Sequence, residues 1–374
     1  MENSVNHKNE RNSSFELLRI ISMLLIVFHH FSVHGKFSYS LTSISFNRFW
    51  IDFMSLGGKV GVNLFVLISG YFLINKDSPL FNFKRILKLW GQMFLYSVVI
   101  YFLFVIFGDV TFSFNTLFEN LIPVLSNKWW FASTYLALFM LHPFINMFLR
   151  NLSKKQYQIL ILLLVIIWSV IPTLLSRDFG LSNLGWFVTL YIISGYIRLN
   201  GFNPKFTRKH YILMFIFTTL ITFLFTIICA YLGKFIPDVK YYTTYLYSQH
   251  KLSILLISVS LFMIFVNIKL SSKLINTVSS TTFGIYLIHD NNYIRPFLWE
   301  TLFNNNHFQH SGWLILYSIG VCLLVFVVCF IIDLIRIKTI EKCYLNVVNK
   351  YSHYIETPCS KLINKLSSFI FGNE

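Results

Sequence analysis

Long apolar runs recur along almost the whole chain, and they constrain its fold more than any other feature. A helix that crosses a bilayer needs about 20 mostly apolar residues. Ten runs approach this description, and they cover residues 15–34, 59–75, 86–108, 130–149, 157–175, 185–199, 211–233, 252–270, 277–294 and 313–335. The runs are continuous rather than alternating, which excludes a membrane β-barrel. The sequence therefore predicts an all-α polytopic membrane protein with about ten transmembrane helices.

The charge of the chain supports this class and argues against a nucleic-acid partner. Only 12% of the 374 residues are charged, compared with about 25% in a typical soluble domain. The formal net charge is nevertheless +16, which on a soluble protein would suggest nucleic-acid binding. In a membrane protein the same excess is expected in cytoplasmic loops. We therefore expect the lipid bilayer, and no nucleic acid, as a partner.

The distribution of Lys and Arg between the loops predicts the orientation. With the N-terminus inside, the inside segments hold more than twice as many Lys and Arg residues as the outside segments. Such a bias is typical of cytoplasmic loops, so both termini are expected to be cytoplasmic. The predicted organisation is a cytoplasmic segment over residues 1–14, a ten-helix domain over 15–335 and a basic cytoplasmic tail over 336–374.

The first apolar run carries ionisable residues, which are costly in a membrane and often functional. Arg19 and His30 are eleven positions apart, so in a helix they share one face, separated by about 16 Å along the axis. Glu16 is three residues before Arg19 and is expected to pair with it. The alternative is that Arg19 extends to the inner headgroups and that His30 is interfacial. His29 points about 100° away, and we interpret it as structural.

Basic and aromatic residues stand at the entrances of other runs. Arg85 and Lys88 share a helix face at a cytoplasmic entrance, where they could hold phosphate groups; the alternative is a topology signal alone. Three tryptophans begin runs from the outer side and could stack on a sugar or form an interfacial belt: Trp129, Trp130 and Trp186. The ninth run ends in His289, which we expect at the same outer level as His30.

Taken together, these motifs resemble the integral-membrane acyltransferase family 3, whose members O-acylate cell-surface glycans. The resemblance covers most of the chain and rests on five motifs in order: Phe15 to Arg19 with His30, Gly61 to Phe65 with Ser69 to Tyr71, Arg85 to Lys88, Trp130 with Leu141 to Phe144, and Thr282 to His289. Two positions depart from the family pattern. Asn63 stands where many members have Asp, so it is given no carboxylate role, and Lys88 stands in place of an Arg.

The resemblance implies an O-acyltransferase of the cell membrane, most simply a bacterial plasma membrane. The expected donor is acetyl-CoA or another acyl-CoA, used as a substrate, with no bound cofactor and no metal. The expected acceptor is a hydroxyl of a surface or extracellular polysaccharide or of its lipid-linked precursor. His30 would act as general base or carry the acyl group itself, together with Arg19, Glu16 and His289. Arg85 and Lys88 would bind the donor, and the three tryptophans the acceptor.

The rival class is a polysaccharide transporter or polymerase without acyl-transfer chemistry. Transporters commonly have repeated halves with broken helices, and no such repeat is recognisable in the sequence. A polymerase is expected to have a sizeable outer loop, whereas the longest here covers about residues 35–58. The sugar, the modified hydroxyl and the acyl group are left open by the sequence.

Overall fold

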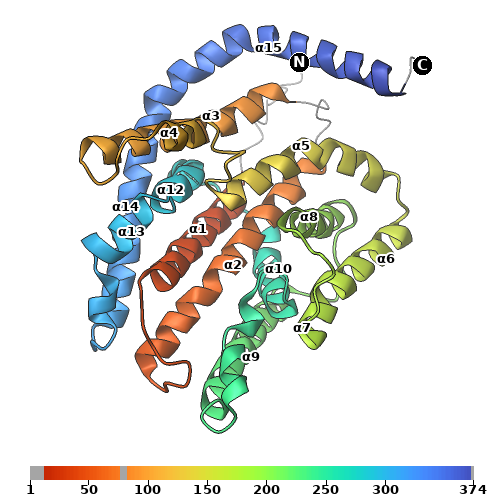
Figure 1. The fold of residues 1–374 in the computed structure, drawn as a ribbon. Helices are drawn as coiled ribbons and strands as arrows, with labels where there is room; N and C mark the ends of the chain where they lie inside the picture. Colours follow the sequence, from red (N-terminus) through yellow and green to blue (C-terminus); the bar gives the residue numbers. More distant parts are fainter. Residues whose placement is uncertain (1–11, 76–81, 372–374) are drawn as a thin grey trace, which may run out of the picture.

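The computed structural model describes residues 12–75 and 82–371 (Figure 1). Most of the predicted segment 1–14 therefore lies outside the described residues. Within the described ranges all regular secondary structure is helical, which confirms the predicted all-α class. The helices are α1 Ser13–His34, α2 Phe46–Leu73, α3 Phe83–Ile106, α4 Phe114–Leu121, α5 Trp130–Arg150, α6 Lys154–Val165, α7 Ile171–Leu175, α8 Asn183–Asn200, α9 Arg208–Leu232, α10 Leu252–Val266, α11 Lys273–Ser280, α12 Thr282–His289, α13 Ile294–Pro296, α14 Leu314–Lys338 and α15 Ile340–Phe371.

Among the described residues, eight helical segments are long and apolar enough to cross a membrane. One of these segments, Lys154–Leu175, consists of α6, a π-helical turn and α7 in succession. The other two predicted spans correspond to α8 and to the pair α11–α12. α8 is only 18 residues long, and Thr281 separates α11 from α12, which have eight residues each. The predicted ninth span is thus a broken helix rather than a continuous one.

The pairing of helices agrees with the predicted alternation, including these two weaker segments. α8 runs parallel to α2, because Trp186 bonds to Asn63 and Arg198 to Tyr71. The segment α11–α12 runs parallel to α1, because Asn276 bonds to Ser13 near their first turns and His289 meets His30 near their last. In these two pairs, the segments expected to share a direction therefore run parallel.

α1 and α2 pack closely because glycines line their contact. A Cβ atom added at Gly58 would lie 2.2 Å from Cγ of His29, and one at Gly61 would lie 2.5 Å from the carbonyl oxygen of Ser22. Small residues are typical of such close helix contacts in membranes. The contact fixes the register between α1 and α2, which are the two helices that carry most of the site.

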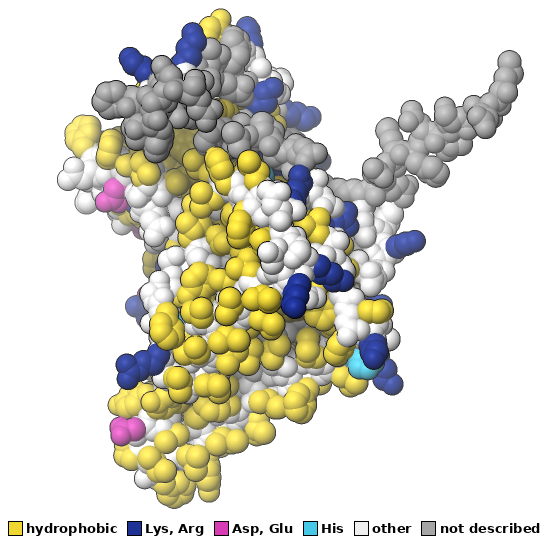
Figure 2. Space-filling view, turned by 90° about the vertical axis from the view of Figure 1, so that its right-hand side faces the viewer, with side chains coloured by type: hydrophobic (Ala, Val, Ile, Leu, Met, Phe, Trp, Pro, Cys, Tyr) yellow, Lys and Arg dark blue, Asp and Glu magenta, His cyan; other side chains and the backbone are white. Residues whose placement is uncertain are grey.

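The outer surface matches a lipid environment. Figure 2 shows a face covered largely by hydrophobic side chains, with Lys and Arg at its upper end and scattered toward its sides. On α9, Phe217 is 66% exposed and Leu220 is 62% exposed. Exposed apolar area on this scale indicates a surface that faces lipid rather than water.

The predicted tail begins inside α14 and continues as the 32-residue helix α15, which crosses one end of the bundle (Figure 1). α15 is attached to α3 by two contacts near its start. The Tyr344 hydroxyl donates to the Leu87 carbonyl at 2.6 Å, and the Lys88 ammonium lies 2.5 Å from a Glu341 oxygen. The start of the tail is therefore part of the folded bundle.

Candidate active site

Two histidines from distant parts of the chain meet where α1 and α12 end. His30 Nδ1 lies 2.9 Å from His289 Nε2, so the predicted common level of these residues is correct. His289 Nδ1 lies 2.6 Å from the Ile285 carbonyl and must carry a proton to bond with it. His289 Nε2 is then the acceptor, and His30 Nδ1 donates to it. This arrangement leaves His30 Nε2 unprotonated in the neutral pair.

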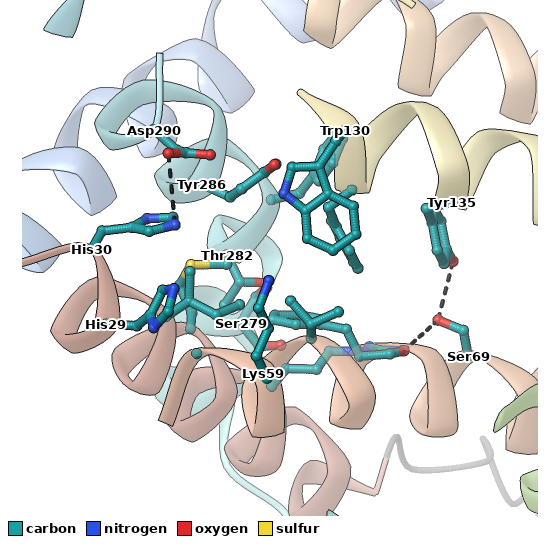
Figure 3. Close-up of a pocket in the computed structure, with 18 of the residues that line it drawn as sticks. His29, His30, Lys59, Ser69, Trp130, Tyr135, Ser279, Thr282, Tyr286 and Asp290 are labelled. Carbon is teal, nitrogen blue, oxygen red and sulfur yellow. Dashed lines mark hydrogen bonds and ion pairs between the residues drawn. The ribbon is translucent and has the colours of Figure 1, made fainter. Parts of the chain in front are cut away.

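A carboxylate lies beside the free nitrogen of His30. Asp290 Oδ1 is 3.6 Å from His30 Nε2 (Figure 3), and Asp290 is only 3% exposed. Arg295 holds the same oxygen, with its Nη2 at 2.8 Å. A carboxylate in this position stabilises the positive charge that His30 gains when it takes up a proton. Asp290 and Arg295 do not stand out in the sequence, although Asp290 directly follows His289.

His30 faces a cavity of about 540 Å³, within the range of about 300–1,000 Å³ that is typical of small-molecule sites. Lys59, Trp130 and Tyr286 line its walls, together with His29 (Figure 3). His29 bonds to the Ser55 carbonyl at 2.6 Å, which agrees with its structural interpretation, but its ring also reaches the cavity. The cavity combines a free imidazole nitrogen, a buried carboxylate and aromatic walls, which together suit proton abstraction from a bound hydroxyl.

Arg19 lies where this cavity meets a second one. Its Nη1 bonds to both oxygens of Glu16, at 2.9 and 3.0 Å, so the predicted pairing is confirmed. Glu16 also accepts a hydrogen bond from Ser279 of α11. The second cavity, of about 870 Å³, shares four wall residues with the first: Arg19, Ser69, Leu89 and Tyr135. The two cavities are therefore adjacent, and Arg19 lies on the wall that they share.

The second cavity is strongly basic. Arg85 and Lys88 line it as the sequence suggested, and Arg198 of α8 joins them. Arg198 donates to the Tyr71 hydroxyl at 3.2 Å and was not selected from the sequence, because α2, α3 and α8 come together only in the fold. Three cationic side chains around one opening are suited to phosphate groups.

The three tryptophans fall into two groups. Trp130 lines the first cavity. Trp129 is 1% exposed and Trp186 is fully buried, and the indole nitrogen of Trp186 donates to Asn63 at 3.0 Å. Neither ring offers a face to a ligand in this structure, so the stacking role predicted for these two residues does not fit their placement. They are core residues that fix the ends of α5 and α8.

One group of side chains near His30 has the composition of a metal site. Potential ligand atoms of His30, His34 and Asp290 all lie within 4.8 Å of one another. Arg295 already neutralises Asp290, and His30 Nδ1 is bonded to His289. A cation there would meet the guanidinium charge at short range, which disfavours a metal in this arrangement.

Comparison with known proteins gives a family. The family model described as the acyltransferase domain, of acyltransferase family 3, matches residues 12–334. The matched region runs from the start of α1 into α14 and contains both cavities. None of the curated proteins and none of the solved structures compared with the chain gives a match.

Proposed function

The chain belongs to acyltransferase family 3, and from this premise we propose that it transfers an acetyl group from acetyl-CoA to a glycan hydroxyl on the other side of the membrane. The chain would lie in a bacterial plasma membrane with cytoplasmic termini. The acceptor would be a surface polysaccharide or its lipid-linked precursor. The observation that carries this proposal is that the basic cavity adjoins, at Arg19, the cavity that the free nitrogen of His30 faces.

The donor enters from the basic cavity in this proposal. The phosphates of coenzyme A bind Arg85, Lys88 and Arg198, and the slender acyl-bearing arm extends past Arg19 toward His30. Arg19 and His30 are about 16 Å apart along α1, so both cannot contact the reacting carbonyl at once. Arg19 therefore holds the donor rather than the transition state, and Glu16 keeps its guanidinium in place.

The acceptor hydroxyl binds in the first cavity, beside His30 Nε2. As the hydroxyl oxygen attacks the thioester carbon, its proton moves to Nε2, and the coenzyme A thiolate leaves. Asp290 stabilises the imidazolium formed, and His289 keeps the ring oriented through Nδ1. The same nitrogen is also placed to carry the acyl group in a covalent relay. Exchange of labelled coenzyme A into acetyl-CoA without acceptor would distinguish that route from direct transfer.

The experiment that tests this function uses purified protein in detergent with acetyl-labelled acetyl-CoA and glycan from the source cells. We expect release of the coenzyme A thiol together with transfer of label to the glycan, and loss of both in His30→Ala. A transporter or polymerase would not consume acetyl-CoA. Glycan-dependent thiol release that persists in His30→Ala would contradict the assigned base.

A further inference from the structure

Lys59 is a charged residue inside the first cavity to which the proposed chemistry gives no role. It lies in α2 between the closely packed Gly58 and Gly61, which hold this stretch of helix against α1. Its side chain is half-buried and reaches into the cavity, where Nζ lies 5.0 Å from the centre of a Trp130 ring (Figure 3). The packing of α2 on α1 therefore directs an ammonium group into the site.

The charges of the cavity wall leave Lys59 without a matching anion. Arg19 is paired with Glu16, and Arg295 is paired with Asp290. Among the described residues, no carboxylate lies within ion-pair distance of Lys59; Asp290 acts on it only from farther away. A half-buried ammonium in a membrane protein is costly without an anionic partner. The cavity wall thus carries one positive charge that forms no ion pair among the described residues.

The position of this charge indicates which substrate neutralises it. The donor phosphates have their own basic cavity on the far side of Arg19. Lys59 shares a cavity with His30 and Trp130, where the acceptor is expected. An ammonium is a compact point charge that pairs with a single anionic group without the two-pronged geometry of Arg.

We propose that Lys59 binds the negative charge of an anionic acceptor, a glycan that carries a carboxylate or phosphate on or beside the sugar that receives the acyl group. The inference rests on the proposed function and narrows its acceptor. Trp130 holds the ammonium in place through its ring face. The anion of the acceptor completes the charge balance of the cavity and brings the neighbouring hydroxyl toward His30.

The test compares matched acceptors that differ only in charge. One pair is an oligosaccharide with a uronic acid and its neutral methyl ester; the other is a phosphorylated oligosaccharide and its dephosphorylated form. Acyl transfer from acetyl-CoA is measured in detergent for the parent, Lys59→Met, Lys59→Gln and Lys59→Arg. Lys36→Met is the matched control, because Lys36 is an exposed lysine on the same side, paired with Glu300 at 3.2 Å.

We expect the parent to prefer the charged member of one pair, and that pair identifies the anion as carboxylate or phosphate. Lys59→Met or Lys59→Gln should raise KM for the charged acceptor by about 10- to 100-fold, with kcat and the neutral acceptor little changed. Lys59→Arg should keep most of the preference, and Lys36→Met should behave as the parent. Size-exclusion profiles identify any variant that does not fold, and the preference of the parent is measured on the unaltered protein.

Acyl transfer by the parent without any preference for charge would overturn this inference and leave the proposed function standing. An equal loss of kcat with charged and neutral acceptors in Lys59→Gln would also overturn it, because Lys59 would then act on the reaction or the fold. No thiol release with any acceptor would overturn the proposed function, and this inference with it.

Discussion

His30 and His289 are 259 positions apart in the sequence, yet Nδ1 of the first lies 2.9 Å from Nε2 of the second. The contact joins the last turns of α1 and α12. Because Nδ1 of His289 donates to a backbone carbonyl, Nε2 of His289 accepts the hydrogen bond and Nδ1 of His30 donates it. A His30 whose Nε2 is free and faces a cavity is prepared to accept a proton from a bound hydroxyl.

Replacing His30 by Ala should abolish acyl transfer while the protein still inserts into the membrane. Loss of a general base costs typically 10²–10⁴-fold in rate. The measurement is label transfer by purified protein at matched amounts, with circular dichroism to verify the helical fold. His29→Gln serves as the control, because His29 bonds to Ser55 rather than to His289. Full activity in His30→Ala with none in His29→Gln would show that the wrong histidine was assigned.

Replacing His289 should show whether it positions the ring of His30, which takes up the proton in the proposed reaction. His289→Ala removes the acceptor for His30 Nδ1–H, so we expect kcat to fall by about tenfold or more with an unchanged KM for acetyl-CoA. His289→Gln offers an amide oxygen to the same proton and should recover part of the rate. The kcat and KM of both variants measure this. Equal rates in His289→Ala and the parent would show that His289 does not position His30 for proton transfer.

Arg85→Ala should weaken donor binding more than it slows turnover. Arg85 lines the basic cavity, and among the described residues its guanidinium is in ring contact with Phe139, 5.6 Å from the ring centre. Phosphate contacts made equally in ground and transition state raise KM without lowering kcat. Lys88→Ala is a less clean variant, because Lys88 also holds Glu341 of α15. An unchanged KM for acetyl-CoA in Arg85→Ala would show that Arg85 does not bind the donor and that its charge only marks the cytoplasmic side of the membrane.

Asp333→Ala should destabilise the fold without a direct effect on the site. Asp333 is fully buried and accepts hydrogen bonds from Tyr96 at 2.7 Å and from Arg336 at 2.6 Å. Removing one member of a buried ion pair costs about 3–5 kcal/mol. The thermal unfolding midpoint in detergent is the measurement, and Lys36→Met, an exposed pair, should leave it unchanged. If Asp333→Ala unfolds at the same midpoint as the parent, the contacts of Asp333 with Tyr96 and Arg336 do not stabilise the fold.

The sequence was sufficient to predict the all-α membrane class, the parallel course of α8 with α2 and of α11–α12 with α1, and the placement of Arg19 and His30 on one cavity. These properties depend on local composition and on the helical period, which act within one segment. The run 277–294 has Ser and Thr at 279–282, but composition alone does not show that the helix breaks at Thr281. Its two short helices are held by contacts with α1, such as the bond between Ser279 and Glu16.

The residues that tertiary contacts bring together were predicted less well. Trp129 and Trp186 have the sequence context of Trp130, but packing buries them while Trp130 borders the cavity. Nothing in the sequence singles out Lys59, because its cavity forms between α2 and the distant α12. Arg198 similarly joins Arg85 only through the contact of α8 with α2.

The most direct test of transfer across the membrane uses sealed vesicles of the two orientations, with acetyl-labelled acetyl-CoA added only outside. Inside-out vesicles present the cytoplasmic face to the donor, so label should reach the enclosed glycan in them. Right-side-out vesicles should give no transfer until they are permeabilised, and His30→Ala should give none in either. Transfer by sealed right-side-out vesicles, at the rate of the inside-out ones, would contradict entry of donor and acceptor from opposite faces.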